Sequence, residues 1–194
     1  KRVAKQIFIP FTVGGGIKTL DDMYRVLDAG AEKISIDSMA VRNPNLIQEG
    51  AAAFGSQCIV LSMQVKKRDD VKKFPSGYEI AIDGARTFTG MDALEWAKKG
   101  EQLGAGEICV NSIDNDGTHG GYDIDITQKI ANTVTIPVIA SGGAGNSEHV
   151  AEVFTNTSSS AAIISSLLYS PRIENVSIET IKTYLIEKGI AVRV

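Results

Sequence analysis

Short apolar runs rich in isoleucine and valine alternate along the chain with longer amphipathic segments. Runs that are apolar throughout, rather than at every second position, are typical of strands buried on both faces of a parallel sheet. Six segments have this pattern, and we expect each to form a strand: Ile7–Val13, Lys33–Asp37, Cys58–Val65, Gly106–Ser112, Ile136–Ser141 and Ala161–Ser166.

The segments between these runs carry start and stop signals of helices. Capping residues precede them and glycines follow several of them. The expected helices begin after Thr19 and end at Gly30, cover residues 44–54, cover Met91–Leu103, and cover Asn146–Phe154. The order of strand then helix, repeated six times, predicts an α/β fold with a parallel sheet.

Residues 66–90 interrupt this alternation. The segment is too long for a strand-to-helix loop, and it contains the apolar stretch Tyr78–Ile82 between the turn sequences Pro75–Gly77 and Asp83–Gly84. We therefore expect a small hairpin that leaves the main fold before the next helix begins.

The number of strand–helix units narrows the fold class. A closed (β/α)8 TIM barrel has eight units and about 250 residues, whereas this chain has 194 residues and six units. We predict a single domain over residues 1–194: a (β/α)8 TIM barrel that lacks about the first two βα units. On this interpretation the chain starts at Lys1 inside a helix.

Charge and composition exclude several classes of function. The chain has 20 Lys and Arg against 23 Asp and Glu, a formal net charge of −3, and its basic stretch 66–73 is interrupted by two aspartates. This balance argues against a nucleic-acid or membrane partner. No apolar run approaches the roughly 20 residues of a membrane span. Cys58 and Cys109 lie in apolar runs and are expected to be buried thiols, so we predict a cytoplasmic protein.

Two stretches of the chain repeat each other at a shift of 127 residues, Ile9–Gly16 and Ile136–Gly143. Each is an apolar run that ends in glycines, and each is followed by a helix and then by a second strand that ends in hydroxyl side chains. In both copies the serine after the second strand lies 22 residues beyond the last glycine. This preserved spacing makes the repeat more informative than either copy alone.

The repeat predicts two phosphate sites. Glycines at a strand end let backbone N–H groups approach a phosphate, and adjacent strand ends form the phosphate site of many (β/α)8 barrels. Two copies indicate a bisphosphorylated substrate. The alternative is that these residues are turn glycines and helix caps. Asp37 would repel a phosphate unless it is protonated or turned away, and it has the alternative of capping the next helix through Val41 or Arg42.

The longest polar loop at a strand end runs from Asn111 to Asp123. We expect Asp114 or Asp116 to have a catalytic or substrate-orienting role, with turn capping as the alternative. A calcium loop is disfavoured because His119 occupies the place of the invariant glycine and no glutamate closes the motif. The histidines have no partner at metal-ligand spacing. We therefore expect no metal and no other cofactor.

Lys33 and Glu107 lie at the starts of two expected strands. They would therefore lie at the N-terminal face of the sheet, where charged residues ordinarily cap the bottom of a barrel.

The motifs assembled so far closely resemble one family, the cyclase subunits of imidazole glycerol phosphate synthase, which act in histidine biosynthesis. The resemblance extends over the whole chain, in order. The matching stretches are Thr12–Ile17, Gly30–Ile36, Phe54–Cys58, Gly104–Ile108, Ser112–Gly117, Gly121–Asp123, Ile139–Gly145 and Val192–Arg193.

The resemblance implies a lyase that works with a separate glutaminase subunit in a heterodimer. Ammonia from that partner would pass through a (β/α)8 barrel built from two half-barrels. At the barrel mouth it would react with the bisphosphorylated phosphoribulosyl-formimino aminoimidazole carboxamide ribotide. The products would be imidazole glycerol phosphate and aminoimidazole carboxamide ribotide.

The resemblance also implies roles for particular residues. One substrate phosphate would contact Gly16, Asp37 and Ser38. Lys33 and Glu107 would belong to a charged ring that gates the ammonia path, and Glu32 would face the glutaminase. The second phosphate would contact a larger set of residues: Asp116, Gly117, Gly143, Ser165 and Ser166.

The chain departs from the family at the catalytic centre. The family has two catalytic aspartates; Gln64 stands in place of the second, and the first has no counterpart because about two βα units are missing ahead of Lys1. Asp37 stands where the family has asparagine. Because glutamine cannot transfer a proton at neutral pH, two other interpretations stay open: a paralogue that uses ammonia to amidinate a surface sugar, and a non-catalytic barrel that binds a phosphorylated metabolite.

Overall fold

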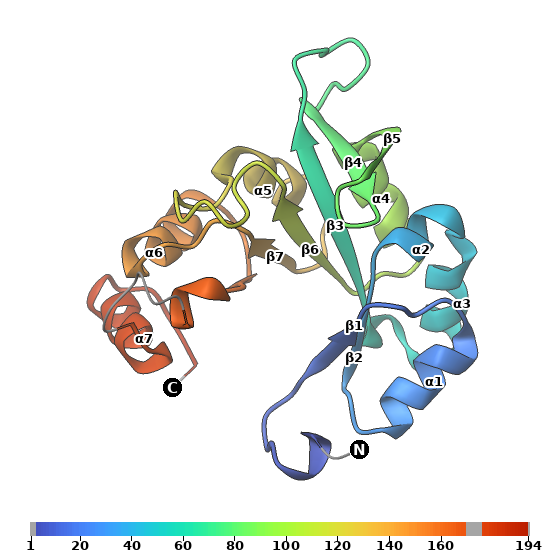
Figure 1. The fold of residues 1–194 in the computed structure, drawn as a ribbon, viewed down its shortest axis with the longest axis horizontal. Coiled ribbons are helices and arrows are strands. Elements are labelled where there is room, and N and C mark those ends of the chain that lie inside the picture. Colours follow the sequence, from blue (N-terminus) through green and yellow to red (C-terminus); the bar gives the residue numbers. More distant parts are fainter. Residues whose placement is uncertain (1–2, 170–175, 194) are drawn as a thin grey trace.

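The computed structural model describes residues 3–169 and 176–193, and within them it contains the expected curled parallel sheet (Figure 1). The parallel strands lie in the order β1-β2-β3-β6-β7-β8. Their bounds are β1 Thr12–Gly14, β2 Lys33–Ile36, β3 Ile59–Lys67, β6 Glu107–Ser112, β7 Val138–Ser141 and β8 Ala161–Ala162. Because consecutive parallel strands are neighbours and helices separate them, the arrangement is that of a (β/α)8 barrel, which confirms the predicted fold class.

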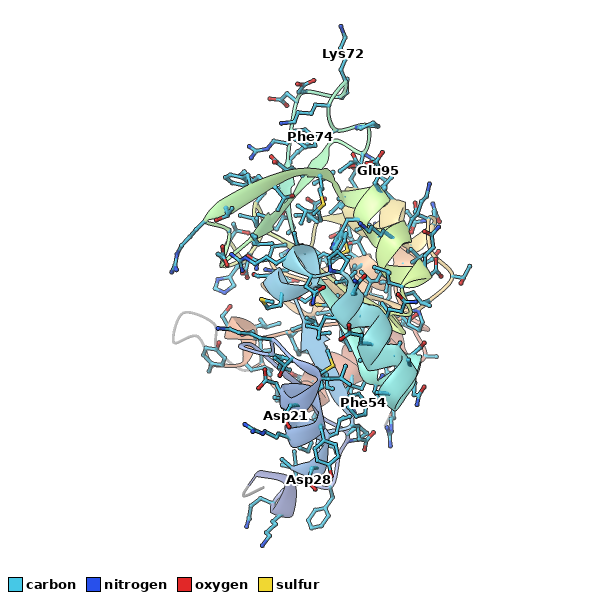
Figure 2. All side chains as sticks on the ribbon, turned by 90° about the vertical axis from the view of Figure 1, so that its right-hand side faces the viewer. Asp21, Asp28, Phe54, Lys72, Phe74 and Glu95 are labelled. Carbon is cyan, nitrogen blue, oxygen red and sulfur yellow. The ribbon has the colours of Figure 1, made fainter. Side chains whose placement is uncertain are left out.

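The helices lie on the outer side of the curl. In Figure 1, α1 to α4 lie to one side of β3, and α5 to α7 lie to the other. Figure 2 shows the outer faces of α1 and α3, with Asp21 and Asp28 on α1 and Phe54 at the end of α3. The bounds are α1 Leu20–Asp28, α2 Ser38–Arg42, α3 Asn45–Phe54, α4 Ala93–Gln102, α5 Ile124–Ala131, α6 Ser147–Asn156 and α7 Ile178–Glu187, with 3-10 turns at Val3–Lys5, Ser56–Cys58 and Ser166–Leu168.

The start of α1 follows the predicted capping signal, whereas the cap of α6 lies at Asn146, which the sequence placed inside the helix. The Thr19 hydroxyl accepts a hydrogen bond from the Asp22 N–H at 3.1 Å, and the Asp22 carboxylate accepts one from the Thr19 N–H at 3.0 Å. This reciprocal pair is a capping box. At α6 the Asn146 side chain accepts from the His149 N–H at 2.8 Å. In the described part of the chain, no helix has the length and apolar character to cross a membrane.

The sheet alternates between a face that packs on the helices and a face that lines the inside of the curl. In β3, Met63 and Val65 are buried in the main core, which also contains Trp96 of α4. Gln64 and Lys66 point the other way and are partly exposed. The chain therefore places its polar strand residues on the inner face, because side chains alternate along a strand.

The expected hairpin forms, with the antiparallel strands β4 (Tyr78–Ile82) and β5 (Thr87–Asp92), and it ends two residues beyond the predicted limit of 90. Strand β4 pairs with the end of β3. The loop between β3 and β4 projects from the body of the molecule, with Lys72 at its far end (Figure 2). Helix α4 begins at Ala93 and not at Met91, because Met91 and Asp92 belong to β5 and Asp92 caps the helix.

Three further boundaries differ from the sequence predictions. The first strand begins only at Thr12: Phe8 and Ile9 are 97% and 71% exposed, so they are not part of a buried strand. The last strand ends at Ala162, four residues before the predicted end at Ser166, where a 3-10 turn begins instead. Cys58 ends a 3-10 turn before β3 and is only half-buried, whereas Cys109 is buried as expected. The predicted helical start at Lys1 lies outside the described residues.

Candidate active site

The inner face of the sheet carries a column of polar side chains from the strand starts to the strand ends. At the bottom, Lys33 of β2 and Glu107 of β6 form an ion pair that reaches across β3. The sequence placed both residues at the N-terminal face, and the structure brings them together. Glu32, next to Lys33, is exposed at the same end.

The first repeat copy forms a pocket at the ends of β1 and β2. Gly16, Asp37 and Ser38 line a cavity of about 270 Å³. Gly16 has a φ of 75°, and an added Cβ would meet nothing within 4 Å. Its backbone therefore lies open to the cavity. A glycine here leaves space for a ligand next to the main chain.

Arg42 supplies a cation to this first pocket that the sequence analysis did not assign. It follows Ser38 by one turn of α2, and its guanidinium group pairs with Asp83 from the turn between β4 and β5. The Ser38 hydroxyl accepts a hydrogen bond from the Asp83 N–H at 2.9 Å. The i to i+4 spacing of Ser38 and Arg42 was the available signal, since such residues share one helix face.

The second repeat copy forms a separate pocket at the ends of β7 and β8. It is smaller, about 40 Å³, and the residues predicted for the second phosphate all line it: Asp116, Gly117, Gly143, Ser165 and Ser166. Gly143 has a φ of 105°, and a Cβ on it would lie 2.0 Å from the Gly121 carbonyl oxygen. Only glycine fits at this position.

His119 also lines the second pocket and was not predicted there. Its Nε2 lies 2.7 Å from the Ser166 hydroxyl, and its backbone is in the left-handed region with a φ of 58°. No sequence signal marked this placement, because a non-glycine residue with positive φ is uncommon. The histidine therefore connects the loop after β6 to the 3-10 turn that follows β8.

Gln64 and Asp37 contact each other on the inner face: the Gln64 side-chain amide donates a hydrogen bond to the Asp37 carboxylate. Asp37 occupies the N-cap position of α2, yet its side chain makes no capping hydrogen bond, with a ψ of −104°. The predicted cap through Val41 or Arg42 is therefore wrong. Burial raises the pKa of the Asp37 carboxyl, the Gln64 hydrogen bond opposes this, and nearby Asp83 adds to the increase.

Asp114 and Asp116 have different surroundings. Asp114 pairs with the Lys66 ammonium group and accepts from the Lys67 N–H at 2.8 Å. Burial alone would raise the pKa of Asp114, but these two hydrogen bonds outweigh it and hold that pKa below its usual value. Asp116 is exposed and lies 3.4 Å from the Asn111 side-chain nitrogen. Gln64 and the two aspartates thus share no partner among these contacts.

Asp123, at the end of the same loop, joins three elements. It accepts from the Tyr78 hydroxyl of β4 and from the Ser112 hydroxyl of β6, both at 3.0 Å, and it caps α5. These bonds fix the polar loop against the hairpin. The described residues contain no group of three or more His, Cys, Asp or Glu side chains placed to hold a metal ion.

Comparisons with known proteins agree with this geometry. A family model described as a histidine biosynthesis protein matches residues 1–174. The chain is 56% identical over 193 residues to imidazole glycerol phosphate synthase subunit HisF of Syntrophobacter fumaroxidans, covering 100% of this chain and 73% of that protein. It is 55% identical to the same subunit of Solidesulfovibrio magneticus, covering 99% of this chain and 73% of that protein. The chain is 59% identical over 169 residues to the same subunit of Nitratidesulfovibrio vulgaris, covering 87% of this chain and 65% of that protein. The expected resemblance is confirmed: the chain belongs to the histidine biosynthesis protein family.

Proposed function

We propose that this chain is a cyclase subunit of imidazole glycerol phosphate synthase. The observation that carries the proposal is the pair of glycine- and serine-lined pockets at opposite ends of the parallel strand order. A bisphosphorylated substrate needs two such sites, one for each end. The names of the relatives, which cover the chain almost completely, support the same function.

The first pocket binds one phosphate through the Gly16 backbone, Ser38 and Arg42. The second binds the other phosphate through a set of small and hydroxyl residues: Gly117, Gly143, Ser165 and Ser166. Open glycine backbones and serine hydroxyls support this assignment, since both supply hydrogen-bond donors without bulk. Asp114 and Asp116 orient the substrate from the loop after β6.

The reaction consumes ammonia that a glutaminase subunit makes. In this proposal the Lys33–Glu107 pair gates the ammonia path at the bottom of the inner face, and Glu32 contacts the partner. The position of the pair supports this assignment, because Lys33 and Glu107 meet at the strand starts, at the opposite end of the sheet from the two pockets. Ammonia adds to the ribulosyl carbonyl of the bisphosphate, and the products are imidazole glycerol phosphate and aminoimidazole carboxamide ribotide.

The test is ammonia-dependent turnover of the bisphosphate by the full-length protein, with Gln64→Asp measured alongside. Product formation by the unaltered protein supports the proposal. No turnover by either protein would contradict it. Tight binding of the bisphosphate without turnover would instead support the second candidate, a phosphometabolite-binding barrel, which Gln64 favours because an amide cannot transfer protons. Turnover only of an ammonia-acceptor sugar would favour the amidinating paralogue.

A further inference from the structure

Asp37 and Asp116 are the two carboxylates lining the pockets that have no ion pair among the described residues, and Asp37 is the less exposed of the two. Asp83 pairs with Arg42, and Asp114 pairs with Lys66. Within residues 3–169 and 176–193, no ion pair involves Asp37. Its side-chain partner is the neutral Gln64 amide. An unpaired, partly buried carboxyl is costly to the fold and is typical of a functional group.

The position of Asp37 connects the first pocket with the inner face. The residue directly follows β2, so it lines the cavity formed with Gly16 and Ser38. Its carboxylate also contacts Gln64 of β3, which pairs in register with Asn111 of β6. A substrate bound by its phosphate in this pocket would therefore pass Asp37 before it reaches the inner face.

The hydrogen bond from Gln64 engages one carboxylate oxygen, Oδ2, and leaves Oδ1 for another partner. A side-chain amide is a suitable partner for a carboxyl group that changes its protonation state, because it can donate to the carboxylate and can equally accept from the carboxylic acid. The pair therefore remains hydrogen-bonded in both protonation states of Asp37. Such a partner orients a group that gains and loses a proton without changing its own charge.

We propose that Asp37 is the proton-transfer residue of this site and that Gln64 is its positioning residue. This inference rests on the proposed function. Relative to the family pattern, in which an asparagine follows the second strand here and an aspartate lies on the third, the carboxyl and the carboxamide have exchanged strands.

The proton transfer balances without any further reactant. Ammonia forms a C–N bond to the ribulosyl carbonyl carbon, and the nitrogen loses a proton to the Asp37 carboxylate. The resulting carboxylic acid gives that proton to the oxygen of the same carbon, which becomes a carbinolamine hydroxyl. In a second cycle the nitrogen loses another proton to the Asp37 carboxylate, the acid gives it to the hydroxyl, and the C–O bond breaks as water leaves and a C=N bond forms. Asp37 returns to its starting state, and the net change at this carbon is ammonia consumed and water released.

The charged surroundings of Asp37 fit a group that works in both directions. Asp83 from the hairpin turn and the buried Cys109 thiol of β6 face it, and Arg42 partly neutralises Asp83. Lys18, from the loop between β1 and α1, lines the same pocket. Burial raises the pKa of Asp37 towards the working pH. A carboxyl with a raised pKa holds a proton more readily than an ordinary aspartate, which favours acid–base catalysis.

The experiment compares four full-length proteins: unaltered, Asp37→Asn, the double variant Asp37→Asn with Gln64→Asp, and Asp21→Asn. Asp21 provides the control, since it lies on the outer face of α1 and is paired with Arg25 there. We measure kcat, KM and the pH profile with added ammonium salt, and bisphosphate binding by calorimetry. Thermal unfolding establishes that each variant is folded.

We expect Asp37→Asn to lower kcat by about 100-fold or more, the usual contribution of acid–base catalysis, while the bisphosphate still binds. The acidic limb of the pH profile disappears in this variant. The double variant recovers at least tenfold of the lost rate, because it returns a carboxyl to the same contact. Asp21→Asn retains the unaltered rate and profile.

The outcomes separate the two proposals. If the unaltered protein turns over and Asp37→Asn keeps its rate within threefold, the inference about Asp37 is wrong and the proposed function stands. The same holds if Asp37→Asn slows turnover but keeps the acidic limb unchanged. If the unaltered protein binds the bisphosphate without turnover, the proposed function fails and the inference fails with it.

Discussion

The guanidinium group of Arg42 forms an ion pair with the carboxylate of Asp83, which joins α2 to the turn between β4 and β5. Both side chains lie in the wall of the first pocket. The hydrogen bond from Arg42 holds the pKa of Asp83 below its usual value, so the carboxylate is ionised at neutral pH. The pocket that we propose for a phosphate therefore contains a cation that is already engaged by an anion.

We expect Arg42→Gln to weaken binding of the bisphosphate by about tenfold, since a charge-assisted hydrogen bond contributes about 1.5–3 kcal/mol and Arg42 must first share its contact with Asp83. Asp83→Asn should strengthen binding by about threefold, because it removes a like charge from the pocket. Isothermal titration calorimetry at fixed ionic strength measures both.

Arg25→Gln is the matched control for this pair of variants. Arg25 is exposed on α1 and pairs with Asp21 at 2.8 Å, away from the pocket. Its replacement removes one positive charge, as Arg42→Gln does, and should leave the affinity unchanged. Weaker binding in Asp83→Asn would contradict our expectation and would mean that Asp83 mainly positions Arg42.

The glycines of the two pockets predict different losses of stability. Gly143→Ala places a Cβ 2.0 Å from the Gly121 carbonyl oxygen and also strains a backbone with a φ of 105°. Gly16→Ala meets nothing within 4 Å. Gly16→Ala should lower the free energy of unfolding by about 1 kcal/mol, from its positive φ alone. Gly143→Ala should lower it by about 3 kcal/mol, because a backbone carbonyl cannot move as a side chain does. Urea unfolding compares them, and equal losses would contradict the close approach.

The sequence repeat predicted which glycines and serines lie together, because the carboxyl ends of parallel strands meet at one edge of a sheet. Gly16 with Ser38, and Gly143 with Ser165, needed only the strand order to be brought together. Their distance along the chain was preserved, so the sequence contained the required information.

Contacts between side chains from different elements could not be predicted from the sequence. The sequence marks Gln64 and Asp37 as two separate departures from the family pattern. Their hydrogen bond depends on the register of β2 against β3 and on the ψ of Asp37. His119 reaches the second pocket only because its φ is positive. Both features depend on tertiary packing, which short-range patterns do not encode.

Acid titration should distinguish Asp37 from Asp114, because their pKa values shift in opposite directions. The pKa of Asp114 is lowered by Lys66 and Lys67. Its ionised form therefore stabilises the fold above the ordinary aspartate pKa, and this stability is lost as the pH falls through the lowered value. The pKa of Asp37 is raised, so its ionised form destabilises the fold at neutral pH, and the penalty disappears on acidification.

We accordingly expect Asp37→Asn to raise the melting temperature at pH 7. This advantage should be lost as the pH falls from the raised pKa of Asp37 to the ordinary aspartate pKa. Asp114→Asn should lower the melting temperature at pH 7, with a difference that shrinks in acid. Differential scanning calorimetry between pH 3 and pH 8 measures both trends. A lower melting temperature of Asp37→Asn at neutral pH would show that the carboxylate stabilises the fold and would contradict the sign assigned here.

The Lys33–Glu107 pair should have separate effects on stability and on ammonia transfer. The two side chains are 33% and 19% exposed, so removing one partner leaves the other charge poorly solvated. We expect Lys33→Met and Glu107→Gln to cost about 1–2 kcal/mol each, and the double variant to cost less than their sum by about 1 kcal/mol. The exposed pair Asp21–Arg25, 66% and 73% exposed, should give a coupling below about 0.5 kcal/mol.

If the pair gates ammonia, its loss should reduce glutamine-driven turnover in the complex with the glutaminase more than turnover with added ammonium salt. Added ammonia can reach the pockets from the strand ends, whereas on the proposed path ammonia made by the partner enters at the strand starts, where the pair lies. The ratio of the two rates is therefore the decisive measurement. A fall of both rates by the same factor would assign the pair a structural role only.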